Sequence, residues 1–296
     1  MKYYLSKFRR AILDKVLFFK LKFFIQNLIS VPIEVINGYI KNYKKIKRLK
    51  LKIINRKFKF DAKKEVIVLR IINAFSLSKD QLNDVDKSLK VKGLWSEWLS
   101  INFKNLITSL KEKNRLNLLI LLENMFQESF TRGFSVYDGY IRLKRPFGNF
   151  YYLYVWQNYL NKYIEGDFNK NELHFPNVGN PSGVLLNGEI IPFEAIRHSY
   201  YAKQFKDLLK NLDDIVAVEI GGGFGGFAYQ FISNMSNKRI KYIIYDLPEV
   251  NAISTFFLMK AFPEKKFLLF GEGNPWDEKV KDFDIAIIPH HQIKKI

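Results

Sequence analysis

Short apolar runs alternate with stretches of helical periodicity over residues 196–296. The pattern predicts helices over residues 196–212, 227–235 and 250–261, and strands over residues 215–220, 240–245, 266–270 and 283–288. Apolar strands that alternate with helices are typical of a parallel sheet with crossover helices. We therefore expect an α/β chain that ends in a Rossmann-like segment over residues 196–296.

The pattern before residue 196 is mostly helical. Residues 94–127 carry apolar residues at helical spacing, and Trp95 and Trp98 share one helix face, where we expect them to be core anchors. Residues 66–72 are rich in β-branched side chains and predict a short strand. We expect three parts: a basic helical arm over residues 1–60, a helical and aromatic-rich acceptor or accessory region over residues 61–195, and the Rossmann-like segment.

Two local patterns mark the second part. Asn187 and Gly188 stand between two apolar runs, which predicts a two-residue hairpin. Ten aromatic residues fall within residues 133–160, and such a density is typical either of a core or of a pocket for a ring-bearing substrate. They are Phe134, Tyr137, Tyr140, Phe147, Phe150, Tyr151, Tyr152, Tyr154, Trp156 and Tyr159.

Positive charge is concentrated at the N-terminus. The 296 residues carry a net charge of +19, yet residues 1–60 hold 17 basic against two acidic residues, whereas residues 201–296 hold 13 against 12. The arm predicts a basic amphipathic helix that packs on its own protein or lies on an anionic membrane surface. The chain would then be cytoplasmic and peripheral at the inner membrane face. Charged residues interrupt its apolar run, so no bilayer span is predicted.

The composition also limits the chemistry. The chain has no cysteine, which excludes a disulfide framework, thiolate metal ligands and a cysteine nucleophile. Nucleic-acid binding is not favoured, because no known nucleic-acid motif accompanies the basic residues. We expect no metal site, because no group of residues has metal-ligand spacing.

A glycine-rich loop between a predicted strand and a predicted helix is the main functional motif. Gly221, Gly223 and Gly226 match the G-x-G-x-x-G pattern of dinucleotide sites, and an acid, Asp246, follows 20 residues later. Alternatively, Glu219 and three glycines match the acid-x-G-x-G-x-G pattern of class I methyltransferases: Glu219, Gly221, Gly223 and Gly225. A tight turn without a ligand is the third interpretation.

The position of the acids favours the methyltransferase interpretation. Glu219 stands two residues before the loop, where a carboxylate can reach a ligand amino group but would repel a pyrophosphate. Asp246 ends the second strand and can accept hydrogen bonds from ribose hydroxyls, or it can cap the next helix. Glu272, after the third strand, is a candidate for the adenine end of the ligand or a turn residue.

Histidines provide the candidate bases. The fourth predicted strand delivers His290 and His291 to its C-terminal tip, where open α/β sheets bind ligands. Neighbouring side chains of an extended chain point in opposite directions, so at most one of the two would act as general base. Arg197 and His198 precede the sheet and are candidates for contact with the acceptor or the cofactor.

Several strings of residues resemble the bacterial sugar O-methyltransferase family. They are Val178-Gly-Asn-Pro-Ser-Gly183, Arg197-His-Ser-Tyr-Tyr-Ala202, the glycine loop from Glu219 to Gly226, Asp246-Leu-Pro-Glu-Val-Asn251 and Phe256-Phe-Leu258. The resemblance covers about residues 130–290. It implies a class I methyltransferase that binds S-adenosylmethionine through Glu219, Gly221, Gly223, Gly225, Asp246, Leu247 and Glu272. The implied acceptor is a sugar hydroxyl, on a surface-glycan precursor.

The sheet of such an enzyme has more strands than the sequence predicts. Seven strands are usual in the class, and four are predicted here. Three explanations are open: a chain truncated at its C-terminus, a second polypeptide that completes the sheet, or completion by residues 66–72. The alternative functions are therefore a catalytically inactive remnant or membrane-associated scaffold and, third, an NAD(P)-dependent oxidoreductase.

Overall fold

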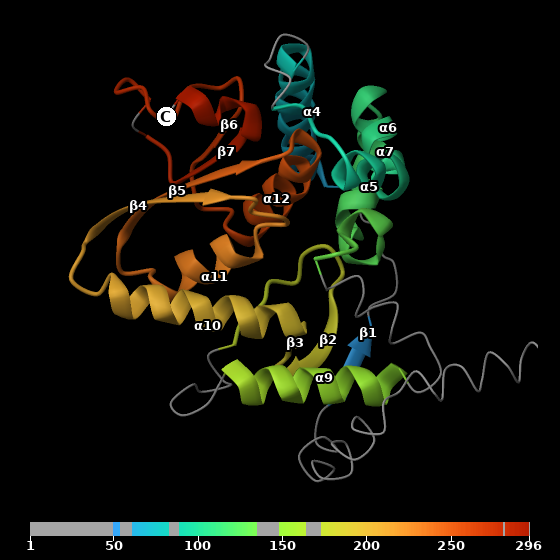
Figure 1. Cartoon of the computed structure of the whole chain (residues 1–296), viewed down its shortest axis with the longest axis vertical. Helices are drawn as coiled ribbons and strands as arrows, with labels where there is room; N and C mark the ends of the chain where they lie inside the picture. Colours follow the sequence, from blue (N-terminus) through green and yellow to red (C-terminus); the bar gives the residue numbers. More distant parts are fainter. Residues whose placement is uncertain are drawn as a thin grey trace, which may run out of the picture.

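The computed structural model of the chain describes residues 50–53, 61–82, 89–134, 148–163, 173–280 and 282–295. A parallel sheet and its helices form one part of the fold, and a group of helices with a small antiparallel sheet forms the other (Figure 1). Buried side chains from both parts belong to the same hydrophobic core. Residues on either side of the expected division at position 195 therefore share that core.

The predicted parallel sheet is confirmed. Its strands, all parallel, are β4 (Asp214–Ile220), β5 (Arg239–Asp246), β6 (Phe267–Leu269) and β7 (Ile285–Pro289). Each lies within three residues of its predicted bounds. Runs such as Ile243–Ile244 are buried on both faces of the sheet, and this burial explains the continuous apolar pattern from which the strands were predicted. The architecture is α/β and consistent with a Rossmann-like fold.

The strand order, β4-β5-β7-β6, differs from that of a doubly wound sheet. In a doubly wound sheet the first strand lies between the second and the fourth. Here the fourth strand, β7, pairs with β5, with Tyr242 opposite Ile285 and Asp246 opposite Pro289. Within the described part of the chain β4 pairs with β5 alone, so β4 is an edge strand. Val216 and Ile220 on one of its faces are 61% and 70% exposed.

Three helices lie on one side of the parallel sheet, and the first of them packs mainly on the second. They are α10 (Phe193–Leu208), α11 (Gly226–Asn234) and α12 (Pro248–Ala261), as predicted to within a few residues (Figure 1). Their buried side chains join those of alternate strand positions, such as Tyr242 and Ile287, in the main core. The opposite strand positions, such as Ile243 and Ile288, form a second, smaller cluster with Phe283.

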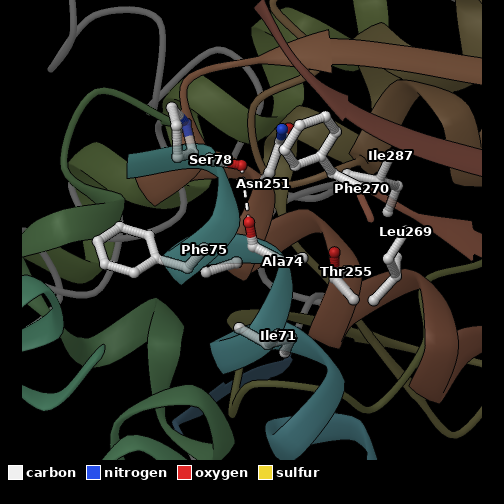
Figure 2. A pocket seen from close by; sticks show the side chains of 11 residues that line it. Ile71, Ala74, Phe75, Ser78, Asn251, Thr255, Leu269, Phe270 and Ile287 are labelled. Carbon is white, nitrogen blue, oxygen red and sulfur yellow. Dashed lines mark hydrogen bonds between the residues drawn. The ribbon is translucent and has the colours of Figure 1, made fainter. Parts of the chain in front are cut away.

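The predicted strand over residues 66–72 is wrong, because this segment lies inside α4 (Ala62–Leu82). Its buried side chains, Ile67, Val68, Ile71, Ile72 and Phe75, recur at helical spacing. Packing against α12 therefore overrides the β propensity of the run. The cavity between α4 and α12, which Ile71, Phe75 and Phe270 help to line, measures only about 10 Å³ (Figure 2). The segment consequently does not complete the parallel sheet.

Helical structure over residues 94–127 is confirmed, in several pieces. They are α5 (Leu94–Asn102), α6 (Lys104–Lys111), α7 (Arg115–Glu123) and the 3-10 turn η2 (Met125–Gln127), followed by η3 (Ser129–Thr131). The break between α6 and α7 follows from Lys113, which has a positive φ of 52°. Asn114 then caps α7, because its side chain accepts a hydrogen bond from Asn117 N at 3.1 Å.

A small antiparallel sheet joins distant segments. Its strands are β1 (Lys50–Ile53), β2 (Ser182–Leu186) and β3 (Glu189–Ile191), in that order. The β2–β3 hairpin is confirmed, with positive φ at both Asn187 and Gly188. β1 falls in the arm that was predicted to be helical, so that prediction is wrong for residues 50–53. Pairing with β2 explains why these residues are extended.

Residues 1–49 and 54–60 of the basic arm lie outside the described residues, and so does its expected contact with a membrane. Among the helices that the structure describes, none is both long and apolar enough to cross a bilayer. Tyr152 and Trp156 of the aromatic-rich segment lie in α9 (Gly148–Tyr163) and are core residues. The Tyr152 hydroxyl and the Trp156 indole N–H donate to the carbonyls of Ser182 and Ile191, respectively, each at 3.2 Å.

Four buried phenylalanines connect the two parts of the fold. Phe126 belongs to η2, Phe175 precedes β2, Phe224 belongs to the glycine loop and Phe257 belongs to α12. Their ring centroids lie 5.0–6.3 Å apart in all six pairs, mostly edge to face. Such pairs are favourable beyond the area that they bury. We call them the phenylalanine cluster.

Truncation of the cluster should destabilise the whole fold. We expect Phe257→Ala to lower the free energy of unfolding by about 3–5 kcal/mol, because it leaves a cavity among three other rings. The matched control is Leu208→Ala, an exposed position on α10, for which we expect a change below about 0.5 kcal/mol. Urea unfolding followed by circular dichroism measures both, and equal midpoints for the two variants would contradict the role of the cluster.

Candidate functional site

The backbone of the glycine loop requires glycine. Gly221, Gly223 and Gly225 have φ values of 79°, 57° and 88°, which residues other than glycine rarely adopt. A Cβ atom at Gly225 would also lie 2.9 Å from the side chain of Leu258. The loop thus turns sharply from β4 into α11 and lies close against α12.

A pocket of about 320 Å³ opens beside this loop. Its volume falls in the range of small-molecule sites. It lies at the C-terminal ends of β4 and β5, where open α/β sheets bind ligands. Its lining residues are Trp95, Gly133, Phe134, Glu194, Arg197, His198, Glu219, Gly221, Gly222, Gly223, Phe224, Phe227, Asp246 and Val250. We call it the glycine-loop pocket.

Asp246 holds the loop at the tip of β5. Its Oδ2 accepts a hydrogen bond from Gly223 N at 2.8 Å, and its Oδ1 accepts one from Leu247 N at 2.7 Å. Burial raises the pKa of Asp246 to about 6, although these two hydrogen bonds act in the opposite direction. The carboxylate is therefore costly to ionise and fixed in position.

Glu219, at the end of β4, is a second buried acid in the pocket. Burial, with a smaller contribution from the nearby Asp246 carboxylate, raises its pKa to about 7. The hydroxyl of Tyr242 donates to Glu219 Oε2 at 2.9 Å and partly offsets this effect. Two acids whose negative charges repel each other thus face one small pocket. A positively charged ligand would stabilise the ionised form of both acids.

The first two turns of α10 form the opposite wall. Glu194 is buried and lies 2.5 Å from Arg197 Nη2 in an ion pair, while His198 Nε2 is 3.9 Å from the same carboxylate. Burial lowers the pKa of His198 to about 3, and the charge of Arg197 contributes. His198 is therefore a neutral imidazole near pH 7.

The structure brings most of the predicted site residues together. Glu219, Gly221, Gly223, Asp246, Arg197 and His198 all line the glycine-loop pocket. Gly225 is the N-cap residue of α11. Leu247 donates its backbone N–H to the Asp246 carboxylate.

Glu272 is separated from this pocket. The Arg70 guanidinium donates to its two carboxylate oxygens at 2.7 and 2.6 Å, and Leu269 N donates to it at 2.8 Å. These bonds hold its pKa below the usual range even though burial alone would raise it. The strand order explains the separation, since β6 lies at the far edge from β4. The predicted contact of Glu272 with the adenine end is thus not supported by its position.

His290 and His291 follow β7, as predicted, but they do not line the glycine-loop pocket. His290 Nε2 lies 2.8 Å from the carbonyl oxygen of Leu89. His291 is only 4% exposed, and its ring lies 5.9 Å from that of Phe270. The same strand order accounts for this result, because β7 is separated from β4 by β5.

The lining also contains residues that were not among the predicted site residues, including Trp95, Phe134 and Glu194. Trp95 was expected to be a core anchor, but it is 53% exposed and stands at the pocket. Phe134 belongs to the aromatic-rich segment, for which a pocket role was left open. Glu194 precedes Arg197 and His198 by three and four residues, and this helical spacing is the signal that would have revealed it. Within the described ranges, no group of three or more acids and histidines is arranged to hold a metal ion.

Comparison of the chain with protein-family models, with curated protein sequences and with solved structures finds no match. The chemistry of the pocket therefore has to be inferred from its own residues.

The raised pKa of Glu219 predicts a pH-dependent effect of its substitution. Between about pH 4.5 and 7 the folded chain retains a proton on Glu219 that the unfolded chain releases, so its contribution to stability declines as pH rises. We expect Glu219→Gln to become more stabilising, relative to the native chain, by up to about 3 kcal/mol between pH 5 and 8. His198, whose lowered pKa acts in the opposite direction, is common to both proteins.

Urea unfolding at several pH values measures this difference. Glu264→Gln is the control, because Glu264 is exposed, and its difference from the native chain should stay constant with pH. A constant difference for Glu219→Gln as well would show that the carboxylate ionises as freely in the folded chain as in the unfolded one.

Proposed function

We propose that the chain binds S-adenosylmethionine in the glycine-loop pocket and is an O-methyltransferase that acts on a sugar hydroxyl. One observation supports this proposal most: the two acids of the pocket, Glu219 and Asp246, both have pKa values raised by burial. S-adenosylmethionine carries an ammonium and a sulfonium group, and these positive charges would stabilise the ionised acids. A dinucleotide pyrophosphate would instead add negative charge.

The residues present fit this cofactor. Glu219 would receive the amino group, and Asp246 would accept hydrogen bonds from the ribose hydroxyls. Gly221 leaves space for close approach to the backbone, since a Cβ there would meet no atom within 4 Å. The cofactor supplies an electrophilic methyl group when it is bound.

The α10 wall would handle the acceptor. His198 is the one histidine among the lining residues. Its low pKa makes it a weak base, but as a neutral imidazole it can accept a hydrogen bond from the acceptor hydroxyl and orient it. The Glu194 carboxylate lies 3.9 Å from His198 Nε2 and is paired with Arg197, so the three residues form one wall that would position the hydroxyl. Trp95 and Phe134 provide aromatic surface at the same pocket. The sugar nature of the acceptor, as part of a surface-glycan precursor, follows from the family resemblance of the sequence.

The second candidate is a non-catalytic scaffold, and the strand order favours it. The exposed edge of β4, with Val216 and Ile220 beside unpaired backbone groups, suits pairing with a second chain. A scaffold would not need the glycine-loop pocket to bind a cofactor.

Calorimetric titration with S-adenosylhomocysteine separates these functions. We expect micromolar binding to the native chain and about 10- to 100-fold weaker binding to Asp246→Asn, which loses charge-assisted hydrogen bonds. Asp207→Asn, at an exposed position on α10, is the matched control and should bind like the native chain.

NAD is the second ligand in the same experiment. Binding of NAD with no binding of S-adenosylhomocysteine would favour the oxidoreductase, and binding of neither ligand would favour the scaffold.

A further inference from the structure

A second cavity, of about 390 Å³, lies on the other side of the parallel sheet. It is formed by the end of α4, by Tyr245 of β5 and by the loop over residues 270–276. Ile288 of β7 and Gln292 of the 3-10 segment η5 (His290–Lys295) complete the lining. It shares no lining residue with the glycine-loop pocket. Its volume is in the range of sites that hold one small molecule.

Three aromatic rings line this cavity. They belong to Tyr245, Phe270 and Trp276. Tyr245 is buried, and the indole N–H of Trp276 donates to its hydroxyl at 2.8 Å, which fixes the indole although it is 38% exposed. Flat rings held in place offer a surface on which another planar ring can stack.

Primary amides provide the polar part of the lining. They belong to Gln81, Asn274 and Gln292. Gln292 Nε2 donates to Gln81 Oε1 at 2.9 Å, so the two amides are held side by side, and Asn274 Oδ1 accepts from Trp276 N at 3.1 Å. None of the described residues that line the cavity is charged. The ligand that fits is therefore uncharged.

The loop that carries Trp276 is held tightly against α4. Gly271 has a φ of 94°, and a Cβ atom there would lie 2.3 Å from Leu77 Cδ1. Only glycine allows the chain to turn at this wall of the cavity. The cavity is thus part of the packed structure rather than a gap beside a free loop.

We propose that this cavity binds the base of an uncharged purine nucleoside. A purine is planar, so it stacks on aromatic rings, and its edge offers neighbouring donors and acceptors that match primary amides. An indole and a phenyl ring together provide more stacking surface than a pyrimidine requires. This site is independent of the methyltransferase proposal, because its residues are separate from the glycine-loop pocket.

The probe is adenosine, titrated by calorimetry into the Asp246→Asn variant, in which binding at the glycine-loop pocket should be about 10- to 100-fold weaker. We expect binding in this background, a loss of about 5- to 100-fold on adding Trp276→Ala, and a change below about threefold on adding Trp276→Phe, which keeps an aromatic ring. Gln81→Ala, at an exposed position, should weaken binding without affecting the fold.

Three results would overturn the proposal. The first is no adenosine binding in the Asp246→Asn background. The second is equal binding with and without Trp276→Ala and with and without Gln81→Ala. The third is tighter binding of methyl glucoside, an uncharged sugar ring, than of adenosine. Titration of the native chain with S-adenosylhomocysteine reports on the other pocket separately, so failure of one proposal is distinguishable from failure of the other.

Discussion

The packing of Phe224 against three other rings is the constraint on which the rest of the structure depends. This ring is the only large apolar side chain of the glycine loop, and it is buried with Phe126, Phe175 and Phe257. The helical part, the segment before the hairpin and α12 thus meet at the loop itself. Glycine allows the three positive φ values of the loop, and the cluster holds the loop in place where it lines the pocket.

Electrostatics then decide what the pocket can hold. Glu219 and Asp246 are placed at the tips of adjacent strands by the parallel register, and both are largely buried. The cost of burying two carboxylates together falls when a cation is bound between them. Arg197 does not supply that cation, because it is paired with Glu194 on the opposite wall. The pocket as folded therefore favours a positively charged ligand.

The sequence predicted the parallel sheet, its crossover helices, the hairpin and the glycine loop with the two acids of the pocket, because periodicity and glycine placement are local signals. It did not predict the strand order, since β7 pairs with β5 for reasons of tertiary packing that periodicity does not carry. That order is why Glu272, His290 and His291 lie away from the pocket. Residues 66–72 were misjudged because their β-branched run also fits one face of α4. Trp95 was misjudged because a helical face can line a pocket as well as a core.

The central claim is that a cationic ligand ionises the buried acids of the glycine-loop pocket. The most direct test is the number of protons exchanged when S-adenosylmethionine binds near pH 6.5, measured by calorimetry in two buffers of different ionisation enthalpy. The ammonium group of the ligand should lower the pKa values of Glu219 and Asp246, so binding should release protons, and Glu219→Gln should reduce the release. Binding without proton release, or with uptake, would contradict this claim.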